Sequence, residues 1–117
     1  MSHDEEAFLL DVVMVLDSMN FHGGVYFGSQ FRDRYEAELP DSLMDTLKST
    51  QFTSIHHDSK FTYFKIKGAY SFMNESFGLL YTDEKDFEDN RILNQKLIRG
   101  SSDGKGDWFF VETKIWK

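Results

Sequence analysis

The sequence predicts an α+β fold in which N-terminal helices pack on one face of an antiparallel meander sheet of four to five strands. Two patterns predict this class. The first half of the chain carries apolar residues at helical spacing, and the second half alternates apolar and polar residues with a period of two. Because the helices come first and the strands last, crossover helices that would join parallel strands are absent, so the sheet is expected to be antiparallel.

The first helix is predicted for residues 4–19. Ser2 and Glu5 form the S-x-x-E pattern of a capping box, which satisfies backbone N–H groups at a helix start. The apolar residues that recur at helical spacing are Phe8, Leu9, Val12, Val13, Leu16 and Met19. They predict one buried stripe on an otherwise polar helix.

Two shorter helices are predicted to follow. One covers residues 30–39 and ends at Pro40, because proline has no N–H to continue a helix. The other covers residues 42–49, where Asp41 or Ser42 is the N-cap.

The central strand of the sheet is predicted for residues 60–72. Phe64, Ile66, Tyr70 and Phe72 fall on one side of an extended chain, and Lys65, Lys67 and Ser71 fall on the other. Such alternation is typical of a strand with one buried face. The other strands are predicted at residues 52–57, 77–81, 91–99 and 108–116.

The last of these strands has two distinct faces. One face carries Phe109, Val111, Thr113 and Ile115, and the other carries Trp108, Phe110, Glu112, Lys114 and Trp116. The pattern leaves open which face is buried. If the first face packs against the helices, Trp108, Phe110 and Trp116 form an exposed aromatic row and a candidate contact surface. In the alternative, the row packs under a helix.

Length and composition predict a single cytoplasmic domain spanning residues 1–117. The chain is 40% hydrophobic and 16% aromatic, which suits one aromatic-rich core. The N-terminus is acidic and lacks the basic region of a signal peptide, and no segment approaches the roughly 20 apolar residues that cross a bilayer. Because the chain has no cysteine, it has no disulfide and no thiolate metal site.

The net charge of −7 is unevenly distributed. Residues 1–50 hold ten acidic and three basic side chains, whereas residues 51–117 hold ten of each. An acidic surface repels nucleic acid and attracts basic proteins. We therefore expect a basic protein partner, with no nucleic-acid or membrane partner.

Five carboxylates follow one another closely in the connection after residue 82. They are Asp83, Glu84, Asp86, Glu88 and Asp89. A calcium loop would need a glycine at its turn and a late bidentate glutamate, and neither stands in register here. Two interpretations remain: a solvated loop, or an acidic lip that enters a basic cleft on another protein.

The histidines do not predict a catalytic or metal site. His3, His22, His56 and His57 lack the helical spacing of metal ligands. His57 has Asp58 beside it, but adjacent residues seldom orient one another as a general base requires. The expectation is a protein without catalytic residues, metal or cofactor, that is, not an enzyme.

In size, acidity and aromatic content the chain resembles the small immunity proteins of bacterial contact-dependent and polymorphic toxin systems. The resemblance is one of composition and carries no motif. It implies a cytoplasmic protein that binds one cognate toxin, such as a nuclease, and blocks its active site. The predicted binding residues are the five carboxylates together with Trp108, Phe110 and Trp116.

Two other functions remain open. Three helices followed by extended segments also match the order of a winged helix that binds nucleic acid, with Lys60, Lys65 and Lys67 as a basic wing. However, the third predicted helix carries Asp41 and Asp45, which repel phosphates. The second alternative is a small ligand-binding protein, for which no group of residues stands out.

Overall fold

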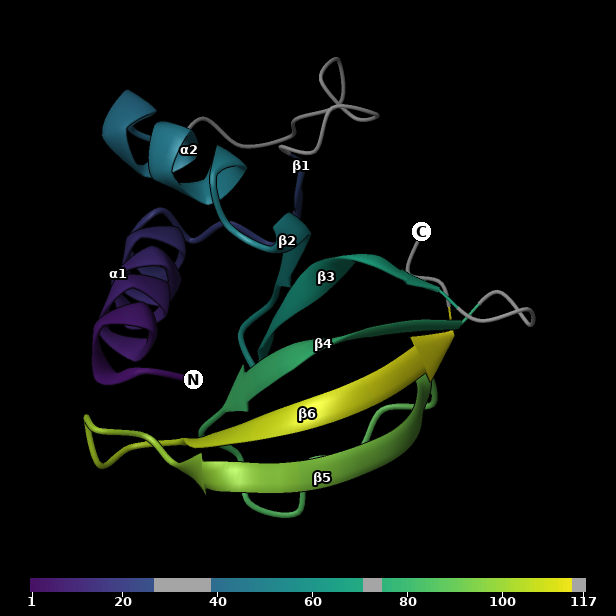
Figure 1. Cartoon of the computed structure of the whole chain (residues 1–117). Helices are drawn as coiled ribbons and strands as arrows, with labels where there is room; N and C mark the ends of the chain where they lie inside the picture. The colour runs from purple at the N-terminus through teal and green to yellow at the C-terminus, as the bar shows by residue number, and fades with distance from the viewer. Residues whose placement is uncertain (27–38, 71–74, 115–117) are drawn as a thin grey trace.

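The computed structural model describes residues 1–26, 39–70 and 75–114 of the chain (Figure 1). This part folds into two helices and one sheet of six strands. In chain order the elements are α1 (His3–Ser18), β1 (Gly23–Tyr26), α2 (Asp41–Lys48), β2 (Phe52–His57), β3 (Thr62–Tyr70), β4 (Glu75–Thr82), β5 (Ile92–Gly100) and β6 (Asp107–Lys114). The α+β class is confirmed, and the predicted helix at 30–39 lies outside the described residues.

Helix α1 begins where the capping pattern predicts. The Oγ atom of Ser2 accepts a hydrogen bond of 3.1 Å from the backbone N–H of Glu5. The helix buries an apolar stripe made of Leu9, Leu10, Val12, Val13 and Leu16. Burying this stripe against the sheet provides most of the stabilisation of α1, because a helix of this length is marginal in water by itself.

All neighbouring strands pair antiparallel, in the order β1-β2-β3-β4-β6-β5. Strands β2, β3 and β4 follow the predicted meander, but β1 adds a sixth strand and the last two strands of the chain, β5 and β6, exchange places in the sheet order. Strand β6 lies between β4 and β5, so the connection 83–91 must pass β6 before β5 begins. The reason is burial: β6 carries the fully buried Trp108 and Val111, whereas most of β5 is exposed and suits an edge.

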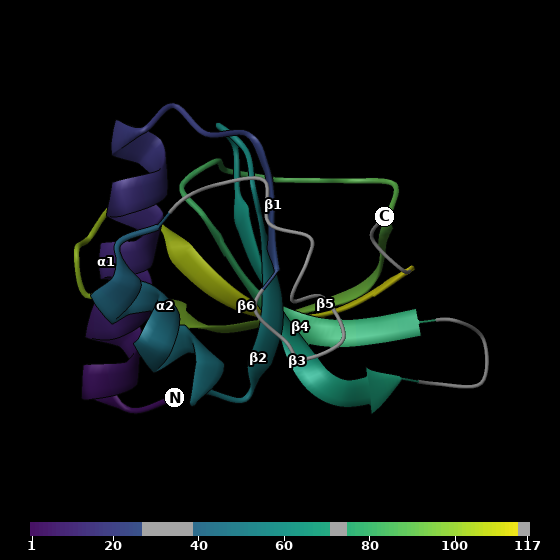
Figure 2. The same ribbon diagram turned by 90° about the horizontal axis from the view of Figure 1, so that it is seen from above.

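The sheet has an apolar cluster on each face. Both helices lie on one side (Figure 2), where α1 and α2 pack against residues such as Ile55, Phe64 and Trp108. A second cluster on the other face includes Tyr63 and Leu80 and is covered in part by Phe87 from the connection 83–91.

The prediction that β3 has one buried face was therefore wrong. Tyr63 is 1% exposed, and even Lys65 is only 6% exposed. Both faces of β3 are covered because β3 is an interior strand with a cluster on each side. The alternation in the sequence identified the strand correctly, but it did not show that the lysine side is also buried.

Within the described residues, no helix has the length and apolar character needed to cross a membrane.

Candidate protein-binding surface

Of the two orientations that the sequence left open for Trp108, the structure has the inward one. The indole is fully buried beneath α1, with ring centroids 5.1 Å from Tyr81 and 6.0 Å from Phe64. Trp108 therefore does not belong to any contact surface. Trp116, the other predicted tryptophan, lies outside the described residues.

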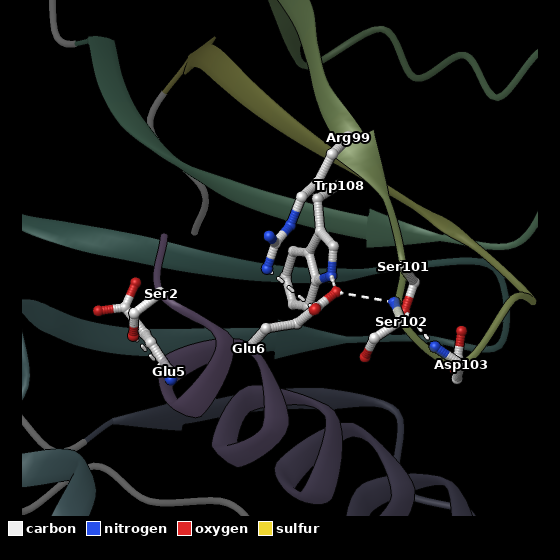
Figure 3. A network of polar contacts seen from close by, with 8 residues as sticks. All are labelled: Ser2, Glu5, Glu6, Arg99, Ser101, Ser102, Asp103 and Trp108. Atoms are coloured by element: carbon white, nitrogen blue, oxygen red, sulfur yellow. Dashed lines mark hydrogen bonds and ion pairs between the residues drawn. The ribbon is translucent and has the colours of Figure 1, made fainter.

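A buried carboxylate joins Trp108 to helix α1 (Figure 3). Glu6 is 1% exposed and accepts hydrogen bonds from Nε1 of Trp108 at 2.8 Å and from the backbone N–H of Ser102 at 3.1 Å. Nη2 of Arg99 forms an ion pair with it at 2.9 Å. Burial raises the pKa of Glu6, but these hydrogen bonds and the charge of Arg99 outweigh it, so the net pKa lies below the ordinary value of 4.5.

This network is structural. It ties the first turn of α1 to the β5–β6 hairpin, and Glu6 has no route to a substrate. Sequence reasoning missed it because Glu6 looked like an ordinary acid in the first turn of a helix. The available signal was its position three residues before Leu9, on the side of the helix that is buried.

Phe110 lies beyond the area that the helices cover. It follows Trp108 by two residues on the same face of β6 and is 40% exposed. Its ring stacks on Phe77 of β4, with centroids 6.0 Å apart and an interplanar angle of 21°. Beside this pair is a shallow recess of about 220 Å³, which is lined by Phe77, Asn94, Gln95, Lys96, Phe110 and Glu112. Phe110 thus remains a candidate contact residue.

Four of the five predicted carboxylates are exposed. They are Asp83, Glu84, Asp86 and Glu88. Phe87, between the last two, is 7% exposed and packs on Phe61 with ring centroids 5.2 Å apart. The buried ring fixes the connection to the sheet, and its carboxylates face solvent.

Asp89 has a different role from the other four. Its two oxygens accept hydrogen bonds of 2.8 Å each from Nε and Nη2 of Arg91. The hydrogen bonds from Arg91 hold the pKa of Asp89 below its ordinary value, although burial opposes them. Arg91 also lies 5.7 Å from the centroid of the Phe61 ring. Asp89 therefore orders the start of β5.

An open recess of about 570 Å³ lies at the end of this connection. Its lining consists of Phe87, Glu88, Asp89, Asn90, Ile92 and Gln95. The recess combines two apolar side chains with an exposed carboxylate and two amides. This composition suits a long basic side chain, because its methylene groups can contact apolar surface while its charge meets Glu88.

A second buried network joins α1 to β2. Nε2 of His57 lies 2.9 Å from Oδ1 of Asp17, and Nδ1 lies 2.6 Å from Oγ1 of Thr62. Since the Asp17 carboxylate only accepts, the neutral ring carries its proton on Nε2 and accepts from the Thr62 hydroxyl at Nδ1. Burial lowers the pKa of His57, and Asp17 partly offsets this effect.

The order Thr62–His57–Asp17 is that of a nucleophile, a base and an orienting acid, but its nucleophile is closed off. Thr62 is 1% exposed, and the space beside it amounts to only about 40 Å³. The network holds α1 against β2. The partner of His57 is not Asp58, the neighbour considered from the sequence, but Asp17, which lies 40 positions away.

Within residues 1–26, 39–70 and 75–114, no group of three or more histidine, aspartate or glutamate side chains could hold a metal ion. No family model, curated protein or solved structure matches the chain.

Proposed function

We propose that this chain is a protein-binding module that inhibits a basic partner, in the manner of an immunity protein that blocks a toxin. The observation that carries the proposal is the exposed set Asp83, Glu84, Asp86 and Glu88 beside the recess of about 570 Å³. Four exposed carboxylates on a connection anchored by a buried ring form a fixed negative surface, which accelerates encounter with a positive one.

The aromatic recess supplies a second contact of different character. Phe110 is an exposed ring whose stacking on Phe77 limits its motion, so a partner would lose little side-chain entropy in covering it. In such an interface the carboxylates govern the rate of association and the ring governs the rate of dissociation. The winged-helix alternative lacks comparable support, because Lys65 of its expected basic wing is buried in an interior strand.

The test begins with a tagged full-length chain, with which the partner is copurified from the source cells and identified. Association is then measured for the wild type and for the quadruple variant Asp83→Asn, Glu84→Gln, Asp86→Asn, Glu88→Gln. We expect a partner with a basic surface and an association rate at least about tenfold slower for the variant at low salt. An unchanged rate and salt dependence would refute the role of the carboxylates.

A matched control neutralises four exposed carboxylates on the helices: Asp4→Asn, Asp11→Asn, Asp41→Asn and Asp45→Asn. This control changes the net charge by the same amount and should slow association much less. To test inhibition itself, the partner is expressed in cells with and without the chain. Growth arrest that the chain relieves supports the proposal, whereas a harmless partner contradicts it.

A further inference from the structure

Strand β5 has the features of an interface strand. It is the last strand in the sheet order, at the edge opposite β1, and within the described part of the chain it pairs only with β6. Leu93, Leu97 and Ile98 on it are 46%, 57% and 40% exposed. Figure 1 shows β5 as a long outer strand beside β6, at the lower edge of the sheet. A long edge with exposed apolar side chains offers backbone hydrogen bonds to another strand, which at Gln95 would take the place of the 3.1 Å bond from its backbone N–H to Oδ1 of Asn94.

The sequence of this strand is nearly symmetric about Gln95. Residues 92–98 read Ile-Leu-Asn-Gln-Lys-Leu-Ile, that is, two apolar, three polar and two apolar residues in either direction. A two-fold axis at Gln95 would set each residue opposite its mirror position on an antiparallel second copy. Leu93 would then oppose the partner's Leu97, and Asn94 would oppose the partner's Lys96. Isologous interfaces require this kind of self-complementarity.

Charge is compatible with the same register and disfavours a neighbouring one. No acidic residue occurs between residues 90 and 102, so in a pair of β5 strands no cation of one strand can meet a carboxylate of the other. Moving the axis from Gln95 to Lys96 would place two Lys96 ammonium groups directly opposite each other, which is unfavourable, and moving it to Asn94 would place each Lys96 opposite the apolar Ile92 of the other copy. With the axis at Gln95, each Lys96 meets an amide.

Two bulges delimit the pairing segment. The register of β5 against β6 shifts between Ile92 and Asn94 and again between Leu97 and Arg99. Residues 94–97 between them pair one for one with β6 and form the regular part of the edge, with Gln95 inside it. Bulges at both ends limit how far a second strand can slide, which favours a closed pair over open-ended association.

We propose that the protein forms a symmetric homodimer in which the β5 strands of two copies pair antiparallel around Gln95. Directly opposed residues in such a pair lie on the same face, so one face of the sheet continues across the axis. Gln95 borders the recess of about 570 Å³, and the two recesses would therefore adjoin at the axis. Each copy carries a net charge of −7, so the dimer should strengthen as salt rises.

The first test measures the molar mass of the protein in solution. Analytical ultracentrifugation or light scattering is used at protein concentrations from about 1 to 100 μM. We expect a concentration-dependent dimer for the full chain. Gln95→Lys and Gln95→Glu, at an exposed position, should each be monomeric because like charges meet at the axis. An equimolar mixture of the two variants should recover the dimer. A wild type that stays monomeric, or a mixture that does not associate, would overturn the proposal.

Single cysteines test the register, since the natural chain has none. In Gln95→Cys the two thiols would lie on directly opposed residues, whose Cα separation of about 5 Å suits a disulfide. In Asn94→Cys they would lie two residues out of register. Mild oxidation should crosslink the first variant much faster than the second, and Met14→Cys on exposed α1 should stay uncrosslinked. Equal crosslinking of Gln95→Cys and Asn94→Cys would overturn the register.

Discussion

The indole Nε1 of Trp108 donates a hydrogen bond of 2.8 Å to Oε2 of Glu6 across 102 positions of the chain. This contact joins the first turn of α1 to β6, the interior strand between β4 and β5. Both residues are buried, so neither partner can exchange this bond for one to water without opening the fold.

Replacing Glu6 should therefore destabilise the protein strongly. We expect Glu6→Ala to lower the free energy of unfolding by about 3 kcal/mol, because it leaves the indole N–H and the Ser102 N–H without an acceptor. Glu6→Gln keeps one acceptor and should lower it by about 1–2 kcal/mol. Urea denaturation measures both, and Asp4→Asn on the same helix turn is the control, expected within about 0.5 kcal/mol. Equal effects at positions 4 and 6 would contradict the network.

Stability should fall on acidification because burial lowers the pKa of His57 below 6.5. Below about pH 6.5 the unfolded chain takes up a proton that the native state resists, so the free energy of unfolding falls as pH falls. The slope is at most about 1.4 kcal/mol per pH unit for one proton. His57→Gln should flatten this dependence without abolishing it, because burial also lowers the pKa of His56.

The measurement is the urea midpoint between pH 7.5 and pH 5, with His3→Gln as the exposed control. If His57→Gln keeps the wild-type dependence while His3→Gln loses it, the buried imidazole is not responsible. Asp17→Asn removes the neighbour that raises the pKa of His57, so it should make the protein more sensitive to acid.

Gly78 of β4 should not tolerate a side chain. A Cβ atom there would come within 2.2 Å of the backbone oxygen of Phe64, and the ring of Tyr63 would also be in its way. The backbone oxygen cannot move without breaking the sheet, so Gly78→Ala should lower the thermal midpoint by several degrees. Gly100→Ala is the matched control, since its nearest neighbour would be 3.6 Å away. A Gly78→Ala variant as stable as wild type would refute this packing.

Phe110 should matter for binding more than for folding. Because it is 40% exposed, Phe110→Ala should lower the free energy of unfolding by only about 1–2 kcal/mol. Against the partner isolated as above, the same change should accelerate dissociation by tenfold or more. Met14→Ala, another exposed apolar residue, is the control and should leave dissociation unchanged. Similar rates for both variants would remove Phe110 from the interface.

Local patterns predicted the elements well. The capping pair and apolar stripe located α1, and the alternation around Phe64 located β3, because both signals come from residues that are close in sequence. The same signals misjudged Lys65, whose burial depends on a second apolar cluster on the far face. The local patterns also could not place β6 in the interior of the sheet, because strand order depends on whether β5 or β6 buries the larger side-chain area.

For the candidate protein-binding surface, too, the sequence determined some features and the tertiary structure determined others. The sequence by itself determined the charge: five carboxylates in one short connection, together with a β5 strand that has no acid, are already present in the printed residues. Only the tertiary structure decided that Asp89 is bound by Arg91, that Trp108 is buried against Glu6 and that Phe110 is exposed. The exposure of Phe110 depends on how far helix α1 extends over the sheet. Contacts between residues that are distant in the sequence determine this extent.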